Sequence, residues 1–285
     1  MHATASGPIV EDVHGNDDLL SIELIRRRLS TRDVGFELHL FNEVPSTNDV
    51  ACRLAEKGAR EGTVVLAETQ SAGRGRFGHS WFSPGNANLY ASVIFRPAIA
   101  PSAVPVFSMI ASLALADAVT GEGVPASVRW PNDVIASGRR VGGTLTVAAA
   151  AGAVVQHVIF GIGVNLNISS EALTGALGPS AAMATSVSEV AGRPIDRNRF
   201  AASLLNRLER WHGLYTGYGP DAVRAAWNQR DALRGRLVEV SGGDTLEAGR
   251  VVGVDGSGQL VLESDSGDTL VACGEVTTVD GTRIR

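Results

Sequence analysis

The 285-residue chain has few cysteines and no long apolar run. Its two cysteines, Cys52 and Cys273, lie far apart and lack the spacing of metal ligands, which predicts free thiols in a reducing compartment. No stretch approaches the roughly 18 uninterrupted apolar residues of a membrane span, and no basic start with an apolar core marks a secretion signal. We therefore expect a cytoplasmic protein that makes no contact with a membrane.

An excess of positive charge is also missing, because 25 Lys and Arg residues stand against 30 Asp and Glu residues. Proteins that bind nucleic acids neutralise phosphates with a basic surface, so this balance argues against nucleic acid as the main partner. A local basic cluster could still hold a small anion. The length and the hydrophobic share of 44% suit one large domain with a sizeable core and a small appendage.

The most distinctive feature that the chain does have is a glycine-rich segment at residues 70–81. It follows the apolar run 63–67, which predicts a buried strand, so the segment is expected to leave a sheet. Its glycines allow the backbone to approach a ligand closely, and Arg74 and Arg76 offer forked donors for carboxylate or phosphate. The Gly-Lys-Ser/Thr ending of a Walker loop is missing. We expect an anion site of another kind.

The remaining pattern predicts an α+β fold, with a mixed β-sheet, packed helices and a small C-terminal SH3-like β-barrel. Residues 1–16 have no periodicity and are predicted to be disordered, and about 35 residues before the first strand are too few for a complete winged-helix domain. We predict a tail and helix at 1–34, a catalytic domain at 35–232 and the barrel at 233–285. Helices are predicted at 19–29, from Ser46 or Thr47 as cap to Gly58, from Pro105 to 116, from Asp196 to 215 and from Pro220 to 227, and strands at 37–44, 63–67, 88–95, 127–130, 141–150, 154–160, 237–240, 249–254, 260–262, 269–272 and 276–279.

Three further polar motifs stand at predicted element ends. Residues 46–48 (Ser-Thr-Asn) begin a helix, where they can cap it or hydrogen-bond a polar small molecule. Residues 129–133 (Arg-Trp-Pro-Asn-Asp) have the composition of a turn. In the motif at 161–167, Leu166 stands where a dinucleotide fingerprint needs its third glycine, which excludes that site. The two glycines at the expected strand end still predict a close approach of the backbone to a ligand or another strand.

In this order, and followed by a small barrel, these motifs resemble those of the bacterial biotin protein ligases, from about residue 35 to the C-terminus. Without room for the winged helix, the chain resembles the ligase-only type. The resemblance implies that biotin attacks the α-phosphorus of ATP, with Mg²⁺ on the pyrophosphate, and gives biotinyl-5′-AMP. A lysine of a biotin carboxyl carrier protein, in acetyl-CoA carboxylase or a related carboxylase, then takes the biotin and releases AMP. Such chemistry needs positioning and electrostatics but no covalent nucleophile.

The resemblance also implies roles for particular side chains. Arg76 and Arg129 would be catalytic, and Asn132 and Asp133 would serve either a metal or the turn. The residues that would read the ureido head of biotin are Ser46, Thr47, Asn48 and Gln70. Those that would contact the carboxylate end and the α-phosphate are Arg74, Gly75 and Arg76, and those that would lie near the nucleotide are Arg74, Trp81, Asn132 and Asn165.

The chain departs from the family pattern at three positions. Arg129 and Arg140 stand where the family usually has Lys, and His79 stands where Arg is common. Arg keeps the charge of Lys but is longer, planar and forked, so the exchange can alter function. Because of Arg129, a catalytically silent biotin-binding paralogue stays open as an alternative. A lipoate- or octanoyl-transferring relative also stays open, because it would share the core fold.

Overall fold

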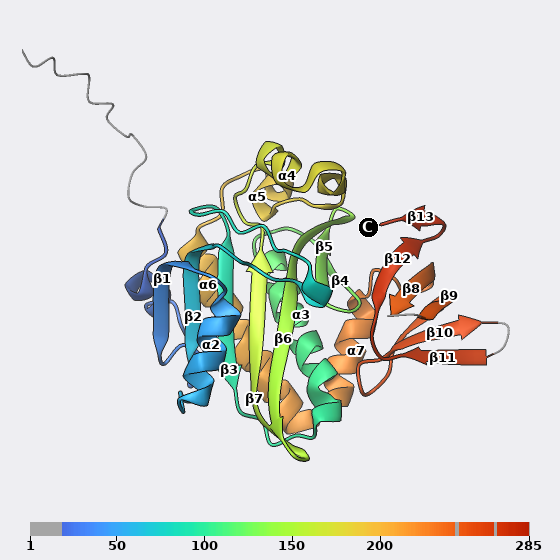
Figure 1. Ribbon diagram of the computed structural model, residues 1–285. Helices are drawn as coiled ribbons and strands as arrows, with labels where there is room; N and C mark the ends of the chain where they lie inside the picture. Colours follow the sequence, from blue (N-terminus) through green and yellow to red (C-terminus); the bar gives the residue numbers. More distant parts are fainter. Residues whose placement is uncertain (1–18, 243–244, 265–266, 285) are drawn as a thin grey trace, which may run out of the picture.

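The structure is a computed structural model that describes residues 19–242, 245–264 and 267–284. A seven-stranded sheet with the order β1-β2-β3-β7-β6-β5-β4 forms its larger part (Figure 1). Neighbouring strands are antiparallel except for the parallel pair β1 and β2. Its strands are β1 (Leu38–Val44), β2 (Val64–Gln70), β3 (Leu89–Phe95), β4 (Ala126–Arg129), β5 (Asp133–Ala136), β6 (Arg139–Ala151) and β7 (Val154–Val164).

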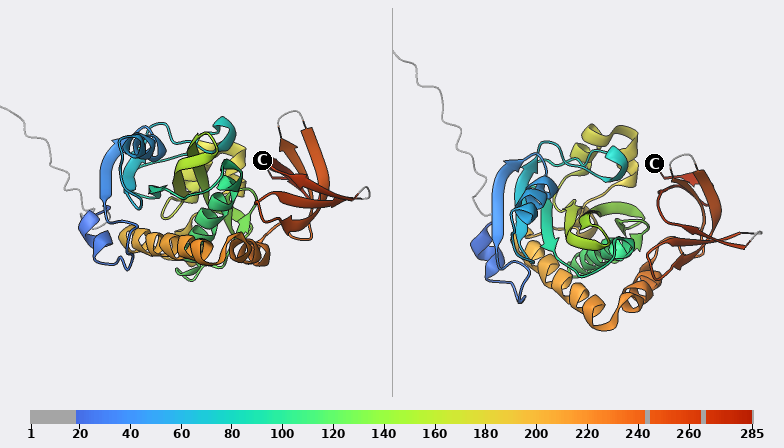
Figure 2. Two further views of the ribbon diagram at one scale, coloured as in Figure 1. Left: turned by 90° about the horizontal axis from the view of Figure 1, so that it is seen from below. Right: turned by 60° about the horizontal axis from the view of Figure 1, so that its bottom comes forward.

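Helices cover both faces of this sheet. On one face, α2 (Thr47–Glu56) packs its apolar side on Val65, Ala67 and Ile159. On the other face lie α3 (Val104–Thr120), α6 (Arg197–Tyr218) and α7 (Pro220–Arg230), which contribute to the main core (Figure 2). The shorter helices are α1 (Ile22–Arg26), α4 (Ser170–Leu177) and α5 (Val187–Ala191), with the 3₁₀ turns η2 (Arg76–Gly78), η3 (Pro101–Ala103) and η4 (Gly178–Met183).

Helix α3 is the central helix of the main core. It is apolar on all sides, and 12 of its 17 residues are buried, as expected for a helix enclosed by protein. With η3 it forms the one helix in the described part of the chain that is long and apolar enough to cross a membrane. Because α3 packs against β6, β7, α6 and α7, its apolar character is explained by the core.

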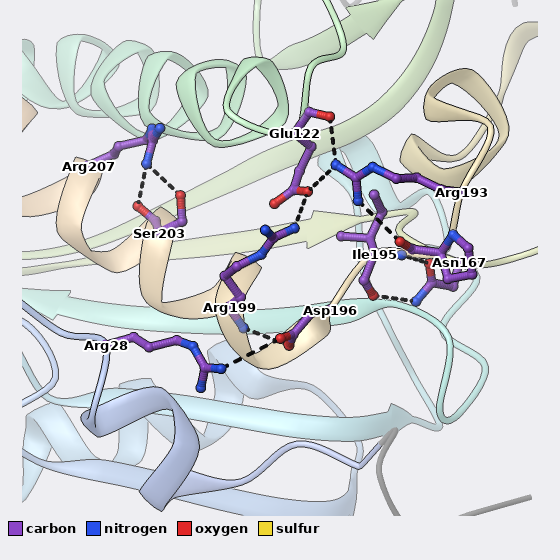
Figure 3. A network of polar contacts seen from close by, with 10 residues as sticks. Arg28, Glu122, Asn167, Arg193, Ile195, Asp196, Arg199, Ser203 and Arg207 are labelled. Atoms are coloured by element: carbon purple, nitrogen blue, oxygen red, sulfur yellow. Dashed lines mark hydrogen bonds and ion pairs between the residues drawn. The ribbon is translucent and has the colours of Figure 1, made fainter.

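A polar network ties the start of α6 to the rest of the domain (Figure 3). The buried carboxylate of Glu122, just after α3, accepts hydrogen bonds from Arg193 at 2.9 Å and Arg199 at 2.6 Å. Asn167, which follows β7, exchanges two hydrogen bonds with the backbone of Ile195, at 2.9 and 2.8 Å. These contacts fix the connection that leads into α6, and Asn167 therefore has a structural partner.

The C-terminal part forms a separate six-stranded antiparallel sheet, as expected for an SH3-like domain. Its contacts with the larger domain include a hydrogen bond from Trp130 Nε1 to the carbonyl of Gly258 (3.2 Å). The predicted boundary at 232/233 lies between α7 and the first strand of this sheet, and the three-part division stays a prediction. The strands are β8 (Leu237–Gly242), β9 (Thr245–Val254), β10 (Leu260–Ser264), β11 (Gly267–Val271), β12 (Glu275–Val279) and β13 (Thr282–Arg283).

The structure corrects several expectations about single elements, while the predicted tail at 1–16 lies outside the described residues. Helix α1 ends at Arg26, although apolar spacing predicted a helix to Leu29. Strand β7 continues to Val164, so the glycines at 161 and 163 lie inside a strand and not at its end. The elements β5, α4, α5 and β13 and the turns η2, η3 and η4 had no expected counterpart. The aromatic side chains of Phe200, Trp211 and Trp227 are buried in the core.

Candidate active site

The separated polar motifs meet at one cavity of about 770 Å³, within the size range of small-molecule sites. Ten of the eleven predicted site residues line it: Ser46, Thr47, Asn48, Gln70, Arg74, Gly75, Arg76, Trp81, Arg129 and Asn132. The eleventh, Asn165, does not. Its buried amide donates to the carbonyl of Thr185 (3.1 Å), so this side chain connects β7 to the segment before α5.

One end of the cavity is lined by the start of α2. The Oδ1 atom of Asn48 accepts a hydrogen bond from the hydroxyl of Ser92 (2.6 Å), and its Nδ2 donates to the carbonyl of Leu145 (3.1 Å). A Cβ atom on Gly161 would lie 2.2 Å from Asn48 Oδ1, so only glycine leaves room for this amide. The first glycine of the motif at 161–167 therefore admits a polar side chain from another element.

Gln70 holds the start of α2 in place. Its Oε1 accepts from the backbone N–H of Thr47 (2.9 Å), and its Nε2 donates to the hydroxyl of Ser83 (3.0 Å). Ser46 occupies the cap position, but its side chain makes no capping hydrogen bond. Ser46 is therefore the cap residue, as predicted, but the expected side-chain cap is missing, and Gln70 instead accepts a hydrogen bond from the N–H of Thr47 at the helix start.

The glycine-rich loop folds back on itself over the cavity. The N–H of Gly75 donates to the carbonyl of His79 (2.7 Å), and Arg74 pairs with Ser80 in an isolated bridge. Arg74 also forms an ion pair with Asp49 of α2. Arg76 Nη2 lies 3.8 Å from Cys273 Sγ, and His79 Nε2 lies 3.3 Å from Glu275 Oε1, so the C-terminal domain contacts this loop.

Trp81 lies against a flat floor made by paired glycines of β6 and β7. Gly143 is opposite Gly163 in the sheet, and a Cβ atom on Gly163 would lie 2.6 Å from Trp81 Nε1. The guanidinium of Arg140 stands 5.4 Å from the centre of the indole ring, within the range of a cation–π contact. Trp81 Nε1 is buried and has no hydrogen-bond partner among the described residues. A buried donor of this kind calls for an acceptor, which a ligand or an ordered water can supply.

The two arginines that depart from the family pattern share one carboxylate. Arg129 donates to Asp133 Oδ2 through Nε (3.2 Å) and Nη2 (2.6 Å), while Arg140 Nη1 lies 3.7 Å from Asp133 Oδ1. The side chain of Arg129 is 10% exposed and that of Arg140 is 31% exposed. Arg140 is thus the more accessible of the two cations, and Arg129 is the more deeply buried one.

Asn132 supplies the turn between β4 and β5. Its Nδ2 donates to the carbonyl of Thr144, while its Oδ1 is buried without a hydrogen-bond partner among the described residues. The side chain therefore stabilises the turn and also offers an acceptor at the cavity. No group of three or more His, Cys, Asp or Glu side chains that could hold a metal occurs in the residues that the structure describes.

Several lining residues were not foreseen. Ser92 positions Thr47 and Asn48 through its hydroxyl. It is the one serine in strand β3, whose other residues are hydrophobic, and this contrast could have identified it. The segment 177–183 forms a mainly apolar wall of the cavity, and no sequence motif predicted that it would line the site. The unforeseen lining residues include Gly143, Thr144, Leu145, Ile162, Leu177, Pro179, Met183, Arg283 and Ile284.

Chemically, the cavity suits anionic ligands. Five arginines line it, and the carboxylates of Asp49 and Asp133 offset two of these charges. Fixed guanidinium groups bind carboxylate and phosphate and stabilise charge that develops on them. The polar end at Asn48 and the apolar wall at 177–183 add sites for an uncharged polar head and for a flat apolar group.

Comparisons with known proteins show the family of the chain. The Biotin/lipoate A/B protein ligase family matches residues 40–165. Biotin--[acetyl-CoA-carboxylase] ligase from Paracoccus denitrificans is 35% identical over 234 residues, which cover 81% of this chain and 96% of that protein. The ligase of the same name from Mycobacterium tuberculosis is 31% identical over 248 residues, which cover 84% of this chain and 88% of that protein.

The fold has the same relatives. The structure is similar to that of a biotin protein ligase from Aquifex aeolicus in complex with biotin and ATP, with a TM-score of 0.70 and 24% identity. That match covers 85% of this chain and 97% of the Aquifex chain. Together with the 35% identity to the Paracoccus ligase, these matches show that the chain belongs to the biotin protein ligase family.

Proposed function

We propose that this protein is an ATP-dependent biotin ligase that forms biotinyl-5′-AMP and then transfers biotin to a lysine of a biotin carboxyl carrier protein. The observation that carries the proposal is the cavity itself, where a buried amide and hydroxyl pair at one end adjoins a cluster of arginines. This arrangement suits a ligand with an uncharged polar head and a carboxylate that must meet a phosphate. The Aquifex relative, whose structure contains biotin and ATP, has the same fold.

In the first step, Ser46, Thr47 and Asn48 would hold the ureido head of biotin, and Gln70 would fix the position of the start of α2. Burial of all three head-binding residues makes their hydrogen bonds selective, because an unmatched polar group there is costly. Arg74, Gly75 and Arg76 would bring the biotin carboxylate to the α-phosphate. Each properly placed donor typically contributes about 3–4 kcal/mol to such a step.

The nucleotide would occupy the side of the cavity lined by Trp81 and the 177–183 wall. Trp81 Nε1 and Asn132 Oδ1 would find their missing partners there. Arg140 would contact the reacting phosphoryl and carboxyl oxygens. The more deeply buried Arg129 would act indirectly, through its positive charge and through Asp133, the carboxylate that it shares with Arg140. Asn165, which does not line the cavity, would act on the nucleotide only indirectly, through the segment before α5. Mg²⁺ would arrive with ATP and neutralise charge on the departing pyrophosphate.

In the second step, the acceptor lysine would attack the mixed anhydride and displace AMP. The carrier would be the biotin domain of acetyl-CoA carboxylase or a related carboxylase, as the name of the Paracoccus relative suggests. We also propose that the protein acts in the cytoplasm, without nucleic acid or membrane as a partner. A net charge of -5 and reduced cysteines suit that setting.

The first step is tested by biotin-dependent exchange of labelled pyrophosphate into ATP. We expect exchange with biotin, none with lipoate or octanoate, and a loss of about 100-fold or more in Arg76→Ala. Tight biotin binding without exchange would favour a silent paralogue. Exchange with lipoate but not with biotin would favour a lipoate-transferring relative and overturn the proposal.

A further inference from the structure

Ser92, Gly161 and Leu145 form one row across three neighbouring strands. Ser92 of β3 is opposite Gly161 of β7, and Gly161 is opposite Leu145 of β6. Figure 1 shows these three strands side by side, with α2 in front of the sheet. The Asn48 amide of α2 lies across the row, because its Oδ1 accepts from the hydroxyl of Ser92 (2.6 Å) and its Nδ2 donates to the carbonyl of Leu145 (3.1 Å). Since Gly161 has no side chain, the amide can pass over β7 and is held at both ends.

The direction of each hydrogen bond in this row follows from the Leu145 carbonyl. A backbone carbonyl only accepts, so it requires Nδ2 of Asn48 on its side and turns Oδ1 toward Ser92. This Oδ1 is also only an acceptor, so Ser92 must donate its single O–H proton to Asn48. The hydroxyl of Thr47 lies 2.8 Å from that of Ser92 and therefore meets an oxygen that can only accept from it.

The second neighbour of the Thr47 hydroxyl is an acceptor as well. It is Gln70 Oε1, at 3.2 Å. The amide of Gln70 is held in this orientation, because its Nε2 donates to Ser83, whose hydroxyl donates in turn to the carbonyl of Trp81 (2.9 Å). Whichever neighbour takes the Thr47 proton, the oxygen of Thr47 offers only lone pairs to the cavity that it lines. This end of the cavity thus presents an acceptor, which matches an N–H group of a ligand.

Ser92 sets this arrangement without meeting the ligand. It is 0% exposed and is not among the described residues that line the cavity. Without its hydroxyl, Asn48 Oδ1 would be a buried acceptor that has lost its donor, which is costly. Thr47 would also lose a neighbour that takes its proton, and its hydroxyl could turn that proton toward the cavity.

We propose that Ser92 is a positioning residue that sets the specificity of the site, because it makes Thr47 an acceptor and fixes the Asn48 amide for a ligand head with N–H donors. This role rests on the proposed function, since the ureido head of biotin carries two N–H groups and one carbonyl. The dithiolane of lipoate and the alkyl end of octanoate have no N–H group for Thr47. Ser92 acts on the binding of biotin and takes no part in nucleotide binding.

The test compares Ser92→Ala with Ser112→Ala, in which a buried serine of α3 loses a hydroxyl that bonds Thr144 (3.1 Å) and lies outside the row. In calorimetric titration, Ser92→Ala should bind biotin about 5- to 150-fold more weakly, as expected when a buried acceptor loses its donor. Ser92→Cys, whose thiol is a weaker donor, should lose less. Ser112→Ala should bind biotin as the wild type does.

Two further readouts separate positioning from a merely structural role. In biotin-dependent pyrophosphate exchange, Ser92→Ala should raise KM for biotin by the factor found in calorimetry, while kcat and KM for ATP stay within twofold. Because Ser92 acts partly through Asn48, Ser92→Ala should weaken biotin binding by a smaller factor in an Asn48→Ala background than in the wild type.

Unchanged biotin affinity in Ser92→Ala would overturn the proposal, as would an equal loss in Ser112→Ala. A parallel rise in KM for ATP, or equal factors in the two backgrounds, would also overturn it. If the wild type binds biotin but shows no exchange, the proposed ligase activity fails, and the calorimetric comparison still decides the role of Ser92.

Discussion

Asn48 of α2 occupies the space that a side chain on Gly161 of β7 would need, with Asn48 Oδ1 only 2.2 Å from the position of a Cβ atom. The two residues are 113 positions apart, and the sheet brings them together. This relationship joins the Ser-Thr-Asn motif to the Gly-x-Gly motif in one structural unit. The need for glycine at position 161 is thus explained by the packing of Asn48 and requires no direct contact between this glycine and a ligand.

Gly161→Ala should therefore damage biotin binding. The new methyl group would displace the Asn48 amide and disrupt its hydrogen bonds with Ser92 and Leu145. Loss of one or two such interactions, at about 1–2 kcal/mol each, should weaken biotin binding about 5- to 900-fold in calorimetric titration. Gly213→Ala, in α6 with open space around its Cβ position, is the matched control and should leave biotin affinity unchanged. Equal affinities in both variants would contradict the role of Asn48.

Arg129 should respond differently to Lys and to Met. Arg129→Lys keeps the positive charge beside Asp133, so we expect pyrophosphate exchange within about tenfold of the wild type. Arg129→Met removes the shorter of the two ion pairs between arginine and the buried carboxylate of Asp133, which should destabilise the fold by about 3–5 kcal/mol. Exchange should also fall by about 100-fold or more. Full activity and stability in Arg129→Met, measured by exchange and urea unfolding, would rule out the assigned role.

Asp231, in the connection before the C-terminal domain, should make stability depend on pH. Burial raises the pKa of this carboxyl to about 6, against the hydrogen bond from Leu233 and the charge of Arg234. Its Oδ2 has no hydrogen-bond partner in the described residues. The folded state thus favours the protonated form, and stability is lost as pH rises from about 4 to about 6.

Asp231→Asn should remove this dependence. In urea unfolding, the variant should be more stable than the wild type at pH 8, by at most about 3 kcal/mol, and the difference should vanish near pH 4. A stability difference for Asp231→Asn that stays constant over this range would show that the carboxyl titrates normally.

Local pattern predicted much of the fold because the elements are strongly marked. The apolar run of β3 and the all-apolar helix α3 leave little choice of structure. The motif order placed the Ser-Thr-Asn, glycine-rich and Trp-Pro-Asn-Asp segments in one site, and the cavity contains all three.

The remaining features depend on contacts between distant parts of the chain. The local pattern of Gly161 and Gly163 predicted the end of a strand, yet both lie inside β7, where Asn48 and Trp81 occupy the space that their side chains would need. Strand β13 has two residues and depends on β12 for its pairing. Helix α4 and the turn η4 are rich in Ala, Gly and Ser, which give little periodic contrast.

The central claim is ATP-dependent transfer of biotin to one lysine of a carrier domain. The most direct measurement incubates the purified protein with biotin, ATP, Mg²⁺ and the biotin carboxyl carrier domain, and locates the modification by peptide mass spectrometry. We predict one biotinylated lysine on the carrier, and none when ATP is omitted. An unmodified carrier with ATP present, or equal modification without ATP, would contradict the account.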